Sequence, residues 1–314
     1  MLCLKQYQFI LPETKEYDDS IGDVTYTYER LWIFFEKIWR HGKPAEIDAN
    51  LCTSCGMIFT NPRFTAEEIK IKYCTVGELG SAETRTRMKP ALKTDERAQR
   101  VYTLLAGLHG NRSKTLRVLD YGGAEGYNLS RFNEAGNLCY VVDYVKSDYP
   151  KGITYLGRDV GDLPCNELFD VILLCHTLEH ATDPRHIIEE LRSHLTEAGL
   201  LYVEVPLGCW NEWKKLVEPL THVNFFSEES LYTCVRSADL DVIYLSSDFQ
   251  YVTHGKLWCV NLVGCKRKGA TVTRFKTTRQ QMENPYYYLE PFMENPGHYL
   301  RRLADKIRGR VFRG

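Results

Sequence analysis

An aspartate and three glycines stand together at residues 118–131, which read V-L-D-Y-G-G-A-E-G-Y-N-L-S-R. The apolar residues before Asp120 are typical of a buried strand, and N-L-S-R-F-N-E-A at 128–135 is typical of a helix. Glycine tolerates positive φ and keeps side chains away from a ligand that approaches the main chain. The stretch therefore predicts a ligand site at a turn between a strand and a helix.

The spacing of the glycines indicates which ligand this turn suits. A dinucleotide fingerprint needs G-x-G-x-x-G, but counting from Gly122 gives Gly122, Ala124 and Tyr127, so one glycine of three matches. The turn therefore does not suit the pyrophosphate of a dinucleotide, and this disfavours a nicotinamide oxidoreductase. The pattern acid-x-G-x-G-x-G fits better, because it gives Asp120, Gly122, Ala124 and Gly126.

The elements that position this turn alternate between strand and helix periods from residue 92 to residue 268. Helices are predicted at 95–110, with Gly110 as the stop, at 128–135, and from Pro184 onward. Apolar runs typical of strands lie at 116–121, 138–143, 169–175, 199–206, 240–247 and 257–265. Short apolar runs separated by helices indicate parallel strands covered on both faces. We predict a doubly wound, mostly parallel α/β domain, which binds ligands beyond the carboxyl ends of its strands.

Two further zones flank the predicted α/β domain. Residues 1–91 form a lobe rich in aromatics, in which 26–40 place aromatic and apolar side chains at helical spacing, most simply as a packing face. The polar stretch 77–90 reads as a connection, so we place the boundary near residue 91. Residues 269–314 form a C-terminal extension that ends in a predicted basic amphipathic helix.

Five motifs in order resemble those of class I S-adenosylmethionine-dependent methyltransferases. They are the turn at 120–126, V-V-D-Y at 141–144, G-R-D-V-G-D-L-P at 157–164, F-D-V-I-L-L-C-H-T-L-E-H-A-T-D-P at 169–184 and G-L-L-Y-V-E-V-P at 199–206. The resemblance implies a Rossmann-like sheet of seven strands and S-adenosylmethionine as the cofactor. One departure is Ala124, which stands where the family has the middle glycine.

The resemblance also implies roles for individual residues. Asp120 faces the cationic amino acid end of the cofactor, Asp143 meets the ribose hydroxyls, and Asp159 meets the adenine amino group. The full set of cofactor-binding residues expected on this basis is Asp120, Gly122, Gly123, Ala124, Gly126, Asp143, Tyr144, Asp159, Val160 and His176.

Three of the nine histidines follow strands at the predicted ligand edge, namely His176, His180 and His222. Imidazole is the natural base near neutral pH, and methyl transfer to a hydroxyl needs proton removal. T-H-V-N-F-F-S at 221–227 resembles a segment of sugar-modifying methyltransferases, so we expect His222 to be the catalytic base and His180 to shape the pocket beside it. Two alternatives remain open: His222 caps or braces the following helix, or His176 and His180 form a metal pair with Glu179.

Cys52 and Cys55 have the spacing of a metal-site pair. The segment 49–63 resembles half of a zinc-binding lobe that precedes the transferase domain in sugar-modifying methyltransferases. Tetrahedral zinc needs four ligands, and the companion pair is absent here. Cys3, Cys74 or His41 offer further ligands, but a metal-free lobe that covers the crevice is the preferred interpretation, so no metal site is assigned.

Composition limits the remaining partners. The chain has 40 basic and 41 acidic residues among 314, so no overall charge favours nucleic acid. Its eleven cysteines suit reduced thiols, and no apolar run is long enough for a signal peptide core or a membrane span, so we expect a cytosolic protein. The C-terminal helix offers contact with a membrane surface, but packing on its own domain is preferred.

The sequence thus predicts an enzyme that methylates a hydroxyl of a sugar, a nucleotide-linked sugar or a glycan with S-adenosylmethionine. Trp210, Trp213 and Tyr202 line the acceptor site or belong to the core. Methylation of a carbon or nitrogen atom of a small molecule is one alternative. A cofactor-binding scaffold without turnover is another, although the presence together of Asp120, Asp143, Asp159 and His222 argues against it.

Overall fold

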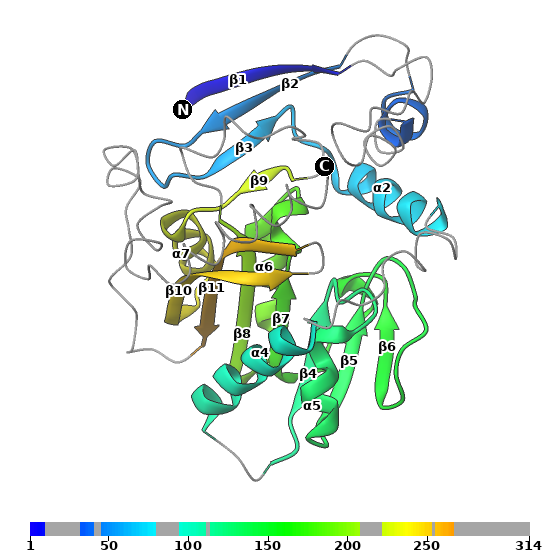
Figure 1. The fold of residues 1–314 in the computed structure, drawn as a ribbon, viewed down its shortest axis with the longest axis vertical. Coiled ribbons are helices and arrows are strands. Elements are labelled where there is room, and N and C mark those ends of the chain that lie inside the picture. Colours follow the sequence, from blue (N-terminus) through cyan, green and yellow to red (C-terminus); the bar gives the residue numbers. More distant parts are fainter. Residues whose placement is uncertain are drawn as a thin grey trace, which may run out of the picture.

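A computed structural model of the chain describes residues 1–9, 32–40, 45–79, 94–110, 114–207, 222–252 and 255–266. Its larger part is built on a seven-stranded sheet of order β10-β11-β8-β7-β4-β5-β6 (Figure 1). These strands span Arg117–Tyr121 (β4), Leu138–Val142 (β5), Ile153–Gly157 (β6), Phe169–Cys175 (β7), Leu195–Pro206 (β8), Asp241–Val252 (β10) and Gly255–Cys265 (β11).

All strand pairs from β6 to β8 are parallel, and β11 pairs antiparallel with both β8 and β10. The prediction of a mostly parallel α/β sheet of seven strands is therefore confirmed. The sequence pattern missed β6, whose residues are only half-buried at the edge of the sheet. The antiparallel direction of β11 follows from its short connection to β10, because a two-residue link cannot hold a crossover helix.

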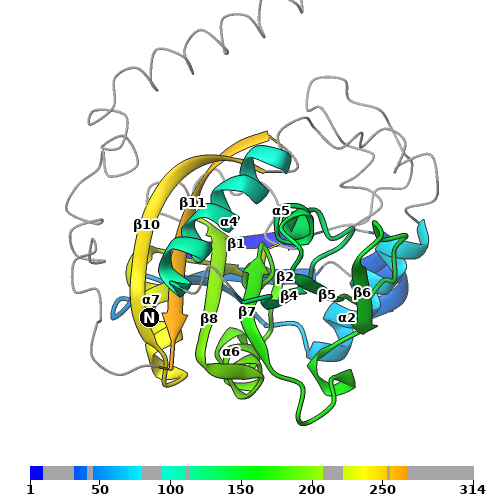
Figure 2. The same ribbon diagram turned by 90° about the horizontal axis from the view of Figure 1, so that it is seen from below.

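Helices cover both faces of this sheet (Figure 2). One face carries α4 (Thr94–His109), η2 (Tyr127–Leu129) and α5 (Ser130–Glu134), and the other carries α6 (Pro184–Ser193) and α7 (Glu228–Ser237). Two separate apolar clusters result, one on each side. Every residue of β7 is buried, as expected for a central strand between two helical layers.

Local signals set the ends of these helices. Asp183 caps α6 by accepting a hydrogen bond from the His186 N–H, and Pro184 occupies the first turn. Gly110 follows α4 with φ of 72°, the left-handed conformation in which helices often end. Both ends lie where the sequence predicts them.

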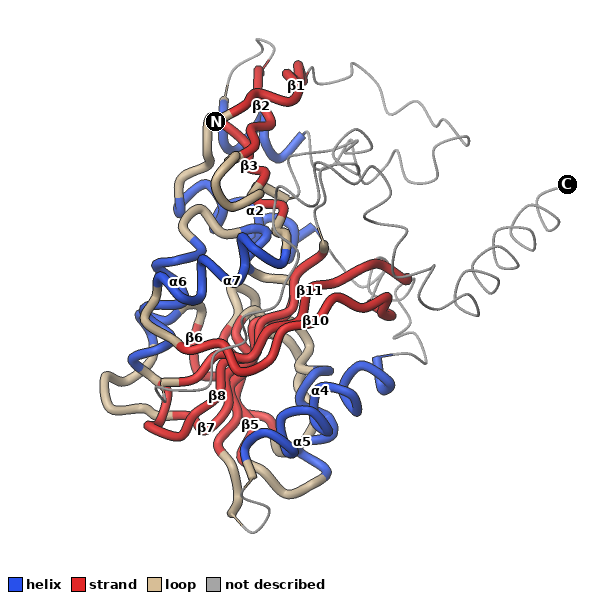
Figure 3. The backbone as a smooth tube through the Cα atoms, turned by 90° about the vertical axis from the view of Figure 1, so that its left-hand side faces the viewer, coloured by secondary structure: helices blue, strands red, loops and turns tan. Residues whose placement is uncertain are grey.

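A second, four-stranded sheet of order β1-β2-β3-β9 lies beyond the carboxyl ends of the parallel strands (Figure 3). Its strands span Leu2–Phe9 (β1), Ala45–Leu51 (β2), Ile58–Asn61 (β3) and Asn224–Phe225 (β9), and it is accompanied by η1 (Phe34–Trp39) and α2 (Ala66–Leu79). Strand β9 comes from the predicted transferase domain, so the two parts share a sheet across the boundary placed near residue 91. That boundary remains a prediction.

The small sheet has its own apolar cluster, which includes Phe34 and Phe35 from the aromatic segment and Val223 from beside β9. The described part of that segment is therefore a packing face, as predicted. None of the described helices is long and apolar enough to cross a membrane. The C-terminal helix expected at 296–308, His41, Trp210 and Trp213 lie outside the described residues.

Candidate active site

The glycine turn packs tightly against the segment that follows β7. Gly122 has φ of 71°, and a Cβ atom there would lie 2.5 Å from the Thr177 Oγ1. A Cβ atom on Gly123 would lie 2.8 Å from the Asp120 carboxylate. The Gly122 N–H also donates to the Val142 carbonyl at 2.8 Å, which ties the turn to β5. Neighbouring side chains therefore leave no room for a Cβ atom at either position. The two glycines also leave the main chain open to a ligand.

Ala124 lies in the same turn at φ of 45°, in the left-handed region. A residue with a Cβ atom is strained in this conformation. Its N–H donates to Asp143 Oδ2 at 2.9 Å, and the Val145 N–H donates to Oδ1 at 3.0 Å. The Asp143 carboxylate is thus fixed at the end of β5, although burial raises its pKa.

Asp120 is fully buried at the end of β4. Its Oδ2 accepts a hydrogen bond from Asn128 Nδ2 at 3.0 Å, whereas Oδ1 has no hydrogen-bond partner among the described residues. Burial is the main reason that the pKa of Asp120 rises to about 7. The side chain lies behind the turn and does not reach the wall of the cavity described below.

Asp159 begins the short helix η3 (Val160–Asp162). Its Oδ1 accepts a hydrogen bond from the Gly161 N–H at 2.9 Å, and Asp162 completes a capping box. Asp162 therefore has a structural role in this turn, and one oxygen of Asp159 has a structural partner. Val160 is buried in the core beside them.

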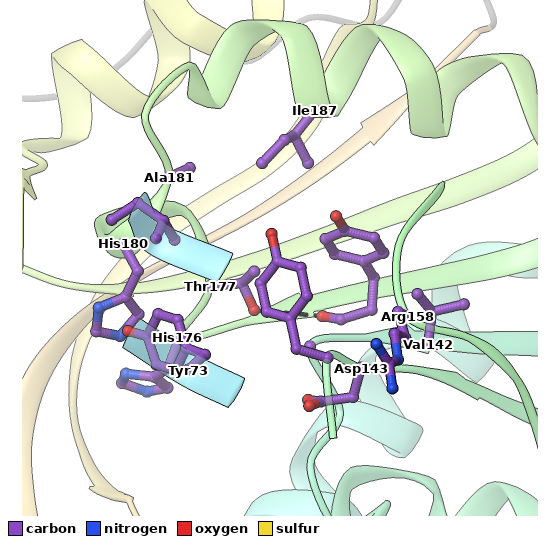
Figure 4. Close-up of a pocket in the computed structure, with 13 residues that line it drawn as sticks. Tyr73, Val142, Asp143, Arg158, His176, Thr177, His180, Ala181 and Ile187 are labelled. Atoms are coloured by element: carbon purple, nitrogen blue, oxygen red, sulfur yellow. Dashed lines mark hydrogen bonds between the residues drawn. The ribbon is translucent and has the colours of Figure 1, made fainter. Parts of the chain in front are cut away.

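A cavity of about 120 Å³ opens at the carboxyl ends of β4, β5 and β7 (Figure 4). Asp143 and Arg158 lie on one side of it, and His176 and His180 on the other. The remaining wall is largely apolar and aromatic, with Ile69, Tyr73, Tyr121, Gly122, Val142, Tyr144, Thr177, Ala181 and Ile187. A carboxylate beside an apolar, aromatic wall suits a nucleoside, because a base packs on the wall while ribose hydroxyls bind the carboxylate.

Tyr73 on α2 closes the cavity from the side of the small sheet. Its ring lies nearly parallel to that of Tyr144, with centroids 6.3 Å apart and an interplanar angle of 16°. It also meets the His180 ring edge-on at 5.5 Å. Helix α2 thus links the cofactor side of the crevice to a cluster of histidines.

Glu179, His180 and His222 form that cluster. The His180 and His222 rings are 4.8 Å apart, and His180 Nε2 lies 3.9 Å from Glu179 Oε1. Glu179 is 1% exposed. Burial would raise the pKa of its carboxyl, but the contact with His176 and the charges of the three imidazoles lower this pKa to about 2. The carboxylate is therefore ionised among three imidazole rings.

His176 stands behind the cluster at φ of 55°, a strained conformation for a non-glycine residue. Its Nδ1 lies 3.2 Å from Glu179 and its Nε2 lies 3.1 Å from Glu204. Burial would lower the pKa of His176, but its contacts with Cys259, Glu179 and Glu204 raise this pKa well above its usual value. A cationic His176 therefore bridges two buried carboxylates.

Glu204 on β8 is the second of these carboxylates. It pairs with Arg97 at 2.7 Å and Arg100 at 2.8 Å, and it accepts a hydrogen bond from the Tyr202 hydroxyl at 2.8 Å. The arginines and His176 hold the pKa of Glu204 well below its usual value despite its burial. Of the two interpretations of Tyr202, the core role is correct, since its side chain is fully buried.

Hydrogen bonds from the two residues after His222 bring it to this place. The Val223 N–H donates to the Glu179 carbonyl at 2.8 Å, and Asn224 Nδ2 donates to the Leu178 and Ala181 carbonyls at 2.9 and 2.7 Å. Ser227 caps α7, so the alternative in which His222 caps that helix is wrong. His222 is not part of the cavity wall but adjoins His180, which is.

Comparison with known proteins shows which family this domain matches. Residues 91–245 match the family model described as a methyltransferase domain. A Burkholderia thailandensis 1,6-didemethyltoxoflavin-N1-methyltransferase, solved with bound 1,6-didemethyltoxoflavin and S-adenosylhomocysteine, is 16% identical. The alignment covers 70% of this chain and 94% of that chain, with a TM-score of 0.48. An S-adenosylmethionine-dependent methyltransferase from Mesorhizobium loti is 11% identical. The alignment covers 55% of this chain and 99% of that chain, with a TM-score of 0.42. A search of curated proteins gives no match.

Residues 91–245 form a class I S-adenosylmethionine-dependent methyltransferase domain. Five of the predicted site residues line the cavity of this methyltransferase, namely Gly122, Asp143, Tyr144, His176 and His180. Gly123, Ala124 and Gly126 shape the turn behind the cavity, and Asp120, Asp159, Val160 and His222 lie outside its wall. The structure thus gathers the predicted residues at one edge of the sheet.

Sequence reasoning missed the contribution of α2 to the methyltransferase site. Ile69 and Tyr73 stand four residues apart on that helix and both line the cavity. Their spacing places them on one helical face, which is the signal that could have found them. It also missed the pairing of Glu179 with His222, which depends on a contact between distant segments.

Cys52 and Cys55 lie in the turn between β2 and β3, and both are free thiols. Burial is the main cause that raises the pKa of Cys55 to about 11. Burial also acts to raise the pKa of Cys52, but hydrogen bonds with Ser54 and Cys55 outweigh it, so the pKa of Cys52 is lowered. Within the described part of the chain, the pair belongs to no group of three candidate metal ligands. The metal-free interpretation of this lobe remains a prediction that elemental analysis can test.

Proposed function

We propose that this methyltransferase acts on a hydroxyl group of a sugar, a nucleotide-linked sugar or a glycan. The observation that carries the proposal is the cluster of Glu179, His180 and His222 beside the cofactor cavity. Methyl transfer to a hydroxyl oxygen requires removal of its proton, and imidazole is suited to that task near neutral pH. The likeness of segment 221–227 to sugar-modifying methyltransferases supports the choice of acceptor.

The cofactor cavity fits S-adenosylmethionine in three respects. Asp143 presents a fixed carboxylate for the ribose hydroxyls, and Tyr144 offers a ring for the adenine. The turn at Gly122 brings the main chain close to the amino acid end, with Asp120 behind it. We propose Asp159 as the partner of the adenine amino group through the oxygen that does not cap η3.

In the reaction, S-adenosylmethionine supplies a methyl group on a sulfonium ion, and the sulfur departs as a neutral thioether. The chain's own residues align the acceptor and remove its proton. We propose that His222 promotes this proton removal, in the simplest form by accepting the proton on one imidazole nitrogen. Tyr73 and His180 close the crevice between the two substrates and limit access of water.

A cytosolic location is also part of the proposal. The described cysteines, both buried and exposed, are free thiols, which suits a reducing compartment.

The test is transfer of a labelled methyl group from S-adenosylmethionine to a panel of nucleotide sugars and glycans. We expect at least one acceptor hydroxyl to be methylated, and His222→Ala to lose at least about 100-fold in turnover, the range found for general bases. S-adenosylhomocysteine should bind the variant with unchanged affinity, because His222 lies outside the cavity wall. Full turnover by His222→Ala would refute the role of this residue, and methylation of carbon or nitrogen alone would refute the acceptor class.

A further inference from the structure

Glu179 places a buried carboxyl group next to the cofactor cavity, between His176 and His180. The residue is 1% exposed, and His176 Nδ1 lies 3.2 Å from Glu179 Oε1. Neither carboxylate oxygen has a hydrogen bond of good geometry from any residue that the structure describes. Burying a charged group without good partners is costly. The arrangement therefore points to a role for these oxygens that the protein's own donors do not fill.

The surroundings of Glu179 indicate the kind of ligand. Possible ligand atoms of Glu179, His180 and His222 all lie within 4.8 Å of one another, and the Glu179 to His180 pair is at 3.9 Å. Ligand atoms at about 2.0–2.2 Å from a tetrahedral ion lie about 3.4 Å apart, so small side-chain rotations close the site. Two imidazoles and one carboxylate with open positions are the ligands of many catalytic zinc sites.

We propose that Glu179, His180 and His222 bind a divalent first-row transition cation such as Zn²⁺ beside the cofactor cavity. This inference rests on the proposed function and deepens it, because it states how His222 acts on the acceptor hydroxyl. The donor set favours Zn²⁺ over Mg²⁺, since Mg²⁺ prefers oxygen ligands and keeps several waters.

The supporting shell around these three residues is already in place. His176 contacts the Glu179 carboxylate on one side and is held by Glu204 on the other. The Val223 N–H, next to His222, donates to the Glu179 carbonyl at 2.8 Å. Partners of this kind orient metal ligands and fix their spacing. The two chain segments that carry the ligands are therefore locked together before any ion binds.

A second group of candidate ligands, His176, Glu204 and Cys259, does not compete for the cation. Glu204 is already paired with Arg97 at 2.7 Å and with Arg100 at 2.8 Å. A cation there would meet the positive charges of these two arginines.

The bound cation changes the acceptor chemistry in a defined way. The acceptor oxygen takes an open position on the cation, which lowers the pKa of its O–H group. The proton passes to a cation-bound hydroxide, which becomes water. The oxygen lone pair then forms the new bond to the methyl carbon, and the electrons of the breaking carbon–sulfur bond go to sulfur. In this mechanism His222 is a ligand of the cation. Removing the His222 side chain abolishes transfer, as it does in the mechanism in which His222 itself accepts the proton.

The experiment is calorimetric titration of the chelator-treated full chain with Zn²⁺, with Co²⁺ as a spectroscopic probe of the same ligands. We expect one Zn²⁺ per chain at this site and a visible Co²⁺ spectrum typical of nitrogen and oxygen ligands. Glu179→Gln should weaken Zn²⁺ binding by about 100-fold or more. Glu190→Gln is the matched control, because Glu190 contacts His186 at 3.5 Å on the exposed face of α6 and should bind Zn²⁺ as the parent does.

The cysteine pair of the small lobe must be separated from this site. The double variant Cys52→Ser/Cys55→Ser should retain the Zn²⁺ site and its Co²⁺ spectrum. Zn²⁺ binding that is lost in this double variant and unchanged in Glu179→Gln would overturn the inference.

Activity then distinguishes the two proposals. We expect methyl transfer to fall at least about 10-fold after chelation and to return with Zn²⁺. Full methyl transfer to a sugar hydroxyl by protein that binds no cation would overturn the cation site and leave the proposed function intact. If the protein binds the cation but methylates no hydroxyl acceptor, the proposed function is wrong. The role of the cation in that reaction is then also wrong, but the cation-binding site itself is confirmed.

Discussion

Ala124 holds a left-handed backbone conformation that glycine adopts at lower cost. We predict that Ala124→Gly raises the free energy of unfolding by about 1 kcal/mol, since relief of strain outweighs the extra entropy of glycine in the unfolded chain. Urea unfolding of parent and variant measures the difference. Gly122→Ala is the opposite case and should destabilise the protein by about 2 kcal/mol or more, because its Cβ atom would meet Thr177. A less stable Ala124→Gly protein would contradict this account of the turn.

Asp120 gives the protein a pH dependence of stability with a definite sign. Its pKa in the folded protein is about 7, above its usual value of about 3.9. The folded state therefore holds the proton more tightly than the unfolded state. It follows that the contribution of Asp120 to stability falls as the pH rises from about 4 to about 7, by at most about 4 kcal/mol.

Asp120→Asn removes this titration while keeping an acceptor for the Asn128 amide. We predict that the free energy of unfolding of Asp120→Asn, relative to the parent, increases between pH 5 and pH 8. Urea unfolding at four pH values in this window measures the trend, and the comparison cancels the other titrating groups. A difference that is constant with pH would show that Asp120 is ionised throughout.

The conformation of the glycines in the turn and the position of Asp143 could be predicted from the residues next to them in the sequence. Gly122 and Gly126 have positive φ, and Asp143 directly follows β5, as the motif spacing implies. Tyr73 was not predicted as a site residue, and Glu179 was considered only in the alternative of a metal pair formed by His176 and His180. Their roles depend on contacts with segments 71 and 44 positions away, which no local pattern reports.

At the scale of elements, strand β9 ties the segment that carries His222 to the small sheet. It pairs with β3 of the small lobe, and Val223 alone separates it from His222. Arg63 fastens this junction, because its guanidinium donates to the Thr182 carbonyl at 3.1 Å and to Asn224 Oδ1 at 2.5 Å. The small lobe thus holds in place the segment beside His222, where we propose that the acceptor binds.

We predict that Arg63→Ala lowers the free energy of unfolding by about 2 kcal/mol, the range for hydrogen bonds to a charged group. It should also reduce methyl transfer more than S-adenosylhomocysteine affinity, because Arg63 holds the loop that follows His180 and does not itself line the cofactor cavity. Chemical unfolding and calorimetry give the two readouts. Arg40→Ala is the control on the same lobe, because Arg40 is exposed and donates to the Lys37 carbonyl. Equal effects of the two substitutions would contradict the role of Arg63.

The elements themselves were predicted to different extents. The strands at the centre of the sheet are continuous apolar runs, so β4, β5 and β7 follow from the sequence. Strand β6 lies at the edge, and its I-T-Y-L-G sequence is too short and too exposed to stand out. Strands β1, β2 and β3 also escaped prediction, because an antiparallel sheet with a strand from residue 224 cannot be recognised from one segment.

At the scale of the whole molecule, the small sheet and α2 lie over the carboxyl edge of the methyltransferase sheet (Figure 1). The cofactor cavity and the histidine cluster lie between them, with Tyr73 in contact with both. This arrangement supports the proposal that one crevice holds the methyl donor at Asp143 and the acceptor beside His222. The fold was predictable because its motifs occur in order, whereas the closure by α2 was not.

The most direct test of the account is calorimetric titration of the protein with S-adenosylhomocysteine, in parent and Asp143→Ala forms. We predict one molecule bound per chain, and at least about a 10-fold loss of affinity in Asp143→Ala, because the ribose hydroxyls lose a fixed carboxylate. Absence of binding by the parent, or equal affinity in the two forms, would contradict the central claim that S-adenosylmethionine binds in this crevice.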